Sequence, residues 1–221
     1  MEDTEKLESQ NVKKRRGMTV PNMLTLFRII LIPLMIIIYY VMGDEPTLFK
    51  TFGSDGTLYM LSWKWVIIAI IFFVAGFTDF FDGMIARKYN LITTFGKFAD
   101  PLADKMLVFS SMTLLLVTIA DGLPTGPLVP VWCFVIMLMR EFMVSGIRML
   151  AASKGEVIAA GWLGKWKTFV TMVAIWVLFF YQTAPFVLYA GQVLMYISCL
   201  LTLLSGAEYL WNSRKIVFES I

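Results

Sequence analysis

With 221 residues, 58% of them hydrophobic and only 16% charged, the chain is too apolar for an ordinary soluble domain. Its net charge of +3 implies no general affinity for nucleic acid. The sequence contains no histidine, the most common general base and transition-metal ligand, so acid–base or metal chemistry has to use carboxylates. We therefore expect a membrane protein that contacts the lipid bilayer and has no nucleic-acid partner.

The chain begins with a polar tail over residues 1–20, which ends in the basic run Lys-Lys-Arg-Arg at 13–16. Such a run is typical of a topology signal on the cytoplasmic side, and attraction to anionic lipid heads is compatible with it. We expect a membrane domain over residues 21–210, followed by a short cytoplasmic C-terminal tail over 211–221.

Apolar runs of roughly 20 residues, enough to cross a hydrocarbon core about 30 Å thick, recur along the chain. They predict an all-α integral membrane fold with six transmembrane helices. The expected spans are 22–42, 62–86, 99–120, 128–151, 166–182 and 186–206. Most lysines and arginines then fall on the side of the N-terminus, whereas the opposite side holds only Lys50, with Lys64 at the start of the second span. This asymmetry places both termini in the cytoplasm of a multi-pass cell-membrane protein.

Four aspartates lie near the cytoplasmic ends of the second and third spans, where an ionised carboxylate costs a few kcal/mol. Asp79 and Asp82 are three residues apart, and Asp100 and Asp104 are four apart, so each pair shares a helix face. Because the two helices are consecutive and antiparallel, we expect the pairs to face each other. Four clustered carboxylates would repel one another unless neutralised, and oxygen ligands suit a hard cation, so they predict a Mg²⁺ or Mn²⁺ site.

Small and basic residues accompany these acids. Gly83, Ala86 and Gly96 leave room beside the carboxylates for a ligand, and the planar guanidinium of Arg87 suits a phosphate group. Gly83 alone could serve only helix packing. The complete set predicts a site that handles a diphosphate and faces the cytoplasm.

The acids also have simpler explanations when each is taken alone. Asp100 is followed by Pro101, so it could cap the third helix, with proline at the first helical position. Either of the first two aspartates could pair with Arg87 or Arg28. Helix capping and single ion pairs are much less able to explain why all four aspartates occur together with the small residues and Arg87.

The stretch from Asp79 to Asp104 matches the signature D-x-x-D-G-x-x-A-R-x8-G-x-x-x-D-x-x-x-D at every fixed position. In this signature the chain resembles the CDP-alcohol phosphotransferase family, and the six-helix layout extends the similarity over most of the chain. The resemblance implies that Asp79, Asp82 and Asp100 bind the metal, and that Asp104 borders the metal site and acts as general base. It also suggests a homodimer.

Looser motifs are similar to the family members that transfer a phosphatidyl group from CDP-diacylglycerol to glycerol 3-phosphate. These motifs are Pro21-Asn22 through Arg28, Arg140-Glu141 with Gly146 through Arg148, and Gly164 through Thr168. The N-terminal tail and the first external loop, 43–61, are longer than such enzymes usually show. The expected products are phosphatidylglycerol phosphate and CMP. A single displacement is favoured over a covalent intermediate, because the sequence offers no Ser–His or Cys–His pair. A carboxylate that acts as nucleophile stays open as an alternative.

Further residues are assigned to the two substrates. The expected CDP-lipid-binding residues are Asn22, Thr25, Gly83, Ala86, Arg87 and Gly96. The first two of these could instead cap the first helix.

The phosphate of the acceptor needs cationic partners, and the expected ones are Arg28, Lys105, Arg140, Arg148, Lys165 and Lys167. Simpler roles remain open for several of them. Lys165 and Lys167 could be interface anchors, Arg148 could form a structural network with Glu141, and Lys105 could extend along the helix toward water.

Other functions are weighed against this one. A sibling enzyme could use serine, inositol phosphate or phosphatidylglycerol as acceptor. A divalent-cation transporter could line its path with buried aspartates, but here the acids cluster near the cytoplasmic side and do not continue through the later helices. A purely structural scaffold would need none of these acids for any activity.

Overall fold

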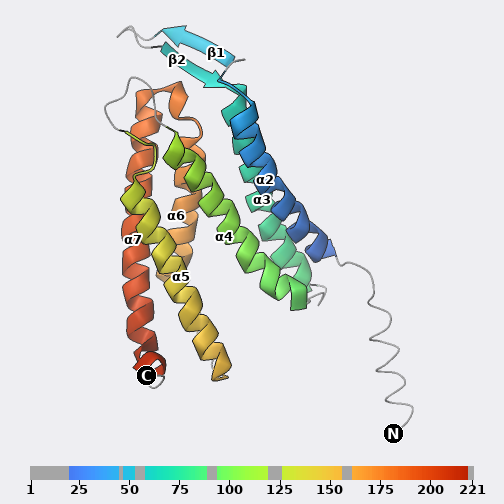
Figure 1. Cartoon of the computed structure of the whole chain (residues 1–221), viewed down its shortest axis with the longest axis vertical. Coiled ribbons are helices and arrows are strands. Elements are labelled where there is room, and N and C mark those ends of the chain that lie inside the picture. The colour runs from blue at the N-terminus through green and yellow to red at the C-terminus, as the bar shows by residue number, and fades with distance from the viewer. Residues whose placement is uncertain are drawn as a thin grey trace, which may run out of the picture.

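The computed structural model describes residues 20–44, 47–52, 58–88, 94–118, 126–155 and 161–218. Over these ranges the chain forms six α-helices, one β-hairpin and one short 3₁₀ turn (Figure 1). The helices are α2 (Val20–Val41), α3 (Trp63–Lys88), α4 (Thr94–Val117), α5 (Val131–Ser153), α6 (Trp162–Leu178) and α7 (Pro185–Phe218). Each overlaps one expected span, so the predicted number and order of helices are confirmed for the described ranges. Helices suit these apolar runs because they satisfy their backbone polar groups internally.

Two helices of the described part are long and apolar enough to be candidate membrane spans, over Asn22–Val41 and Pro185–Arg214. A shorter apolar stretch covers Trp63–Thr78 of α3. The other helices carry charged residues within or beside their apolar runs, and most of the residues expected to form the site are among them. The crossing of the membrane by all six helices stays a prediction.

A β-hairpin stands where the sequence predicted only a long external loop. Strand β1 (Thr47–Phe52) pairs antiparallel with β2 (Leu58–Ser62). The backbone N–H of Ser62 donates to Oε1 of Gln182 at 3.2 Å, which ties the hairpin to the 3₁₀ turn η1 (Tyr181–Thr183). The all-α prediction is wrong for this segment, because its Thr, Phe and Tyr residues favour paired strands outside the bundle.

Lys64, the basic residue at the hairpin end of α3, is almost fully buried and paired. Its Nζ forms an ion pair of 2.8 Å with Oδ1 of Asp44, and it lies 5.3 Å from the ring centre of Tyr39 and 5.6 Å from that of Trp65. The carboxylate and the two rings offset the cost of burying this charge.

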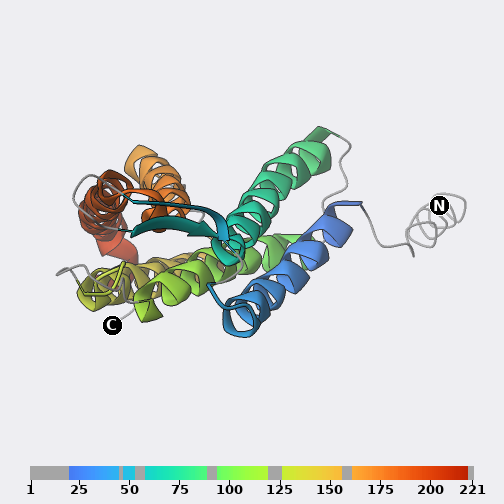
Figure 2. The same ribbon diagram turned by 90° about the horizontal axis from the view of Figure 1, so that it is seen from above.

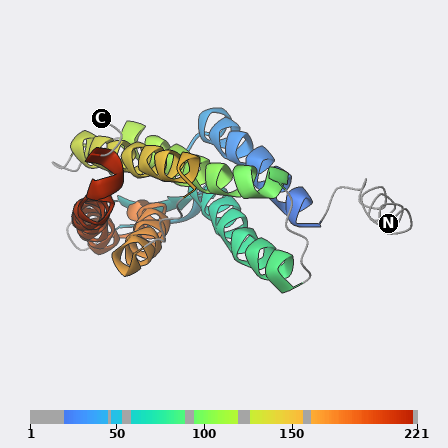
Figure 3. The same cartoon turned by 90° about the horizontal axis from the view of Figure 1, so that it is seen from below.

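The helices divide into two groups joined by α4. In the views from above and below, α2 and α3 lie together on one side and α5, α6 and α7 on the other, with α4 between them (Figures 2 and 3). The fully buried core side chains, among them Met35, Trp65, Leu115, Phe179 and Leu188, gather toward the hairpin end. At the opposite end α3 diverges from α7 (Figure 1). The charged residues Arg148, Lys165 and Glu208 belong to the ends of α5, α6 and α7 on that side.

Several helix boundaries differ from the prediction, and those of α4 and α7 affect the site. Helix α4 begins at Thr94 rather than 99, so Asp100 and Pro101 lie inside it. Helix α7 continues past the predicted end at 206, across the expected tail boundary at 210, to Phe218. The last turns of α7 therefore add side chains to the polar end of the bundle.

Candidate active site

Two side-chain pairs connect α2 with α4. Oγ1 of Thr25 donates to Oδ1 of Asp100 at 2.5 Å, and a guanidinium nitrogen of Arg28 donates to Oδ1 of Asp104 at 2.6 Å. The partners are three residues apart on α2 and four apart on α4, so each pair follows one helix face. The alternative that Asp100 caps a helix is wrong, because this residue lies inside α4 and accepts from Thr25 instead.

Arg28 is completely buried, whereas 45% of the Asp104 side chain is exposed. The guanidinium Nε also donates to the backbone oxygen of Ala75 on α3 at 3.1 Å. Arg28 thus joins three helices and holds Asp104 from its buried side, while part of the Asp104 side chain is exposed. This position does not support the predicted contact between Arg28 and the acceptor phosphate.

The predicted metal site is described only in part. The side chains of residues 79–88 lie outside the described part of the structure, so the roles of Asp79, Asp82, Gly83, Ala86 and Arg87 stay predictions. Among the side chains that are described, no three acidic or cysteine residues form a metal-binding group. Asp100 and Asp104 share one face of α4, with Gly96 buried one turn earlier, and their oxygens are of the type that Mg²⁺ prefers.

Five of the six cations assigned to the acceptor line one pocket of about 490 Å³ at the end of the bundle opposite the hairpin. These cations are Lys105, Arg140, Arg148, Lys165 and Lys167. They come from α4, α5 and α6, and α7 supplies the remaining wall. Of the described residues that line the same pocket, two carry carboxylates, Glu141 and Glu208. The excess of positive charge favours an anionic ligand, because the cations would otherwise repel one another.

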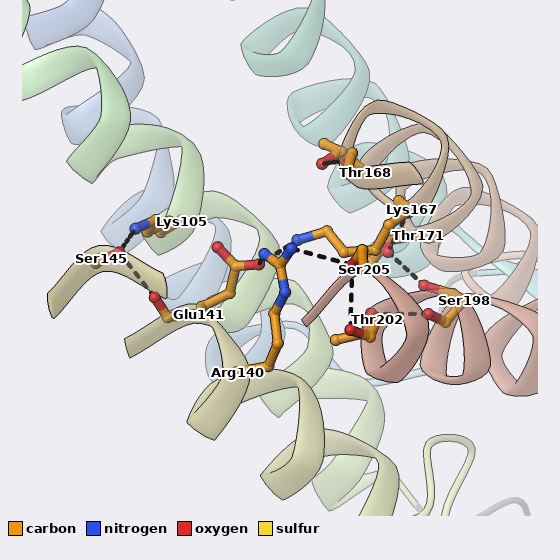
Figure 4. Close-up of polar contacts among 11 residues, drawn as sticks. Lys105, Arg140, Glu141, Ser145, Lys167, Thr168, Thr171, Ser198, Thr202 and Ser205 are labelled. Atoms are coloured by element: carbon orange, nitrogen blue, oxygen red, sulfur yellow. Dashed lines mark hydrogen bonds and ion pairs between the residues drawn. The ribbon is translucent and has the colours of Figure 1, made fainter. Parts of the chain in front are cut away.

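Glu141 organises the centre of this pocket (Figure 4). Its Oε1 accepts hydrogen bonds from Nζ of Lys167 and, at 2.8 Å, from a terminal guanidinium nitrogen of Arg140. The other terminal nitrogen of Arg140 donates to Oγ of Ser205 on α7 at 3.0 Å. Cations from two helices are therefore fixed around one carboxylate oxygen, which lowers their mutual repulsion.

The remaining cations have partners of other kinds. Nζ of Lys105 donates to Oγ of Ser145, whose hydroxyl donates to a backbone oxygen of α5. The guanidinium carbon of Arg148 lies 5.6 Å from the ring centre of Tyr209, and the hydroxyl of that buried tyrosine has no hydrogen-bond partner among the described residues. Lys165 is exposed at the pocket edge. The pocket thus keeps hydrogen-bonding capacity for a ligand.

A second cavity, of about 260 Å³, brings Asp104 next to the cationic pocket. The two cavities share lining residues, which are Lys105, Glu141, Arg148, Lys167 and Thr168. One small molecule could therefore place an anionic group among the cations and a hydroxyl group at Asp104.

Sequence reasoning missed the contribution of α7. Ser205, Glu208, Tyr209 and Asn212 line the pocket at a spacing that puts them on one helix face. This polar face was visible in the sequence, but the sixth span was predicted to end at 206. Glu141 was noted as part of a motif and as a structural partner of Arg148, but it was not assigned to the site, although it lines the pocket.

The chain is similar to known proteins over most of its length. A family model described as CDP-alcohol phosphatidyltransferase matches residues 18–204. A Bacillus subtilis protein named CDP-diacylglycerol–glycerol-3-phosphate 3-phosphatidyltransferase is 36% identical over 202 residues, covering 89% of this chain and 97% of that protein. An Escherichia coli protein of the same name is 35% identical over 203 residues, covering 90% and 97%. One from Rickettsia prowazekii is 36% identical over 193 residues, covering 86% and 92%.

Proposed function

The chain belongs to the CDP-alcohol phosphatidyltransferase family, and from this premise we propose that it transfers the phosphatidyl group of CDP-diacylglycerol to glycerol 3-phosphate. The products are phosphatidylglycerol phosphate and CMP. The names of the relatives support this reaction. The observation that carries the choice of acceptor is the pocket of five cations beside Asp104, because it fits an acceptor with its own phosphate better than it fits serine.

The proposed reaction is a single displacement at the phosphorus that bears the lipid. Asp104 takes the proton of the acceptor hydroxyl while that oxygen bonds to phosphorus and the bond to the CMP oxygen breaks. Arg28 keeps the carboxylate oriented through Oδ1. The cationic pocket holds the acceptor phosphate, so the hydroxyl is delivered to the base with little loss of freedom in the transition state.

The metal would be held by Asp79, Asp82, Asp100 and Asp104, and the CDP-lipid by Asn22, Thr25, Gly83, Ala86, Arg87 and Gly96. A bound Mg²⁺ or Mn²⁺ supplies positive charge at the diphosphate and at the departing CMP. The hydrogen bond from Thr25 supports this arrangement by orienting Asp100. We further propose a homodimer in the cell membrane with six crossings and the site open to the cytoplasm.

The direct test uses purified protein in lipid vesicles with CDP-diacylglycerol, Mg²⁺ and one acceptor at a time. Release of CMP is expected with glycerol 3-phosphate and not with serine, inositol phosphate or phosphatidylglycerol, and Asp104→Asn should abolish it. A preference for one of those other acceptors would assign the chain to a sibling activity. No CMP with any acceptor would refute the enzyme proposal, and metal flux across sealed vesicles without the nucleotide lipid would favour a transporter.

A further inference from the structure

Glu141 occupies a place that its role as a partner of cations does not fully explain. Its side chain lines both the cationic pocket and the cavity at Asp104, so it lies where the two meet. Arg140 and Lys167 both donate to Oε1, and no described residue donates to Oε2. The side chain remains 17% exposed, and Oε2 is not among the buried polar atoms without a partner. One oxygen is therefore anchored, and the other is open to the cavities.

The proposed acceptor has a group to match this oxygen. Glycerol 3-phosphate carries a phosphate at one end, the attacking hydroxyl at the other and a secondary hydroxyl on the carbon between them. When the ends lie in the cationic pocket and at Asp104, the middle carbon lies at the junction of the cavities. Of the five described residues shared by the two cavities, only Glu141 carries a carboxylate, and Lys105, Arg148 and Lys167 can only donate. Thr168 offers only a neutral hydroxyl oxygen, and its proton is donated to the backbone oxygen of Gly164.

We propose that Glu141 is the specificity determinant for the acceptor's secondary hydroxyl, which donates a hydrogen bond to Oε2. This inference rests on the proposed function and identifies the residue that selects its substrate. The carboxylate suits the task because two cations fix it through Oε1, so little side-chain freedom is lost on binding.

The same contact would let the site distinguish the two enantiomers of the acceptor. The two mirror-image glycerol phosphates both present a primary hydroxyl and a phosphate at their ends, and they differ only in the direction of the secondary hydroxyl. Contacts to the two ends alone cannot separate them. A third contact, to the secondary hydroxyl on the middle carbon, can distinguish the two mirror-image forms, and Glu141 provides this contact.

The test combines variants with an acceptor that lacks the secondary hydroxyl, 3-hydroxypropyl phosphate. In the wild-type protein, kcat/KM for CMP release should be on the order of 10- to 100-fold higher with glycerol 3-phosphate, the effect of one hydrogen bond to a charged group. In Glu141→Ala this ratio should fall to about one, and the near-isosteric Glu141→Gln should give an intermediate ratio. Discrimination between the two mirror-image glycerol phosphates should decline in parallel.

The ratio separates substrate recognition from a structural role. If Glu141 only gathers the cations, its variants lower kcat/KM for both acceptors by the same factor and leave the ratio unchanged, which would overturn the inference. Lys165→Ala is the matched control, because loss of a phosphate contact should affect both acceptors equally. A wild-type ratio near one would also overturn the inference while leaving the proposed function intact. The proposed function itself fails only if wild-type protein releases no CMP with glycerol 3-phosphate.

Discussion

Arg28, completely buried on α2, donates to Oδ1 of Asp104 on α4 at 2.6 Å, and its Nε donates to Ala75 on α3 at 3.1 Å. The partly exposed carboxylate is therefore oriented by a cation that has no access to solvent. A buried guanidinium needs such a partner, since its desolvation is otherwise very costly. The geometry makes Arg28 a positioning residue for the proposed base rather than a ligand of the acceptor phosphate.

Arg28→Lys tests this role because it retains the charge but loses the planar fork that reaches two acceptors. We expect kcat to fall by about 100-fold, since small displacements of a catalytic group have effects of that order. The KM for glycerol 3-phosphate should stay nearly constant. Steady-state CMP release at saturating CDP-diacylglycerol separates the two constants. A higher KM with unchanged kcat would instead restore the original assignment of Arg28 to the acceptor phosphate.

Thr25→Val removes the hydroxyl that donates to Asp100 while keeping the shape of the buried side chain. If Asp100 binds the metal, the half-maximal Mg²⁺ concentration for CMP release should rise about 10- to 100-fold, as for other residues that orient metal ligands. Chelation with EDTA should abolish wild-type activity, and added Mg²⁺ or Mn²⁺ should restore it. Thr113→Val is the matched control, because that exposed hydroxyl only donates to a carbonyl of its own helix. An unchanged Mg²⁺ requirement in Thr25→Val would separate Asp100 from the metal.

The parts of the site that depend on local spacing could be predicted from the sequence. Asp100 and Asp104 share a face of α4 because residues four apart lie one above the other on any helix. Lys165 and Lys167 line one pocket with Arg148, as expected where consecutive antiparallel helices meet at the same end of a bundle, and their contact with the acceptor phosphate stays a prediction.

The parts that depend on the relative register of distant helices could not be predicted. Nothing in the spacing of Arg28 shows that it meets Asp104 rather than the acceptor pocket, because that contact is set by how α2 packs against α4. The hairpin had a local signal, since Gly53-Ser-Asp-Gly56 separates two runs rich in aromatic and β-branched residues. This signal was not used, because the apolar membrane-spanning runs on either side favoured a loop between two helices. The polar end of α7 was missed because apolar runs mark only the part of a helix that lies in lipid.

The proposed orientation predicts which positions face the outside of the cell. With the two buried cysteines Cys133 and Cys199 replaced by alanine, Lys50→Cys on the hairpin should react with a membrane-impermeant thiol reagent in intact cells. Arg214→Cys, exposed near the end of α7, should react only after the membrane is opened. Mass-shift labelling followed on gels measures both, and the reverse pattern would place the site outside the cytoplasm.

Gly191→Ala tests the packing of α6 against α7, the two helices that carry Lys167 and Ser205. A Cβ atom at Gly191 would lie 2.6 Å from Cδ2 and 2.7 Å from Cγ of Leu178, which is completely buried. We expect a loss of about 1–3 kcal/mol of stability from this overpacking, seen as a lower Tm of the protein in detergent. Gly146→Ala on α5 is the control, because its Cβ meets nothing within 4 Å and alanine favours a helix by up to about 1 kcal/mol. If the two variants had the same Tm, the close approach of α6 and α7 at Gly191 would be refuted.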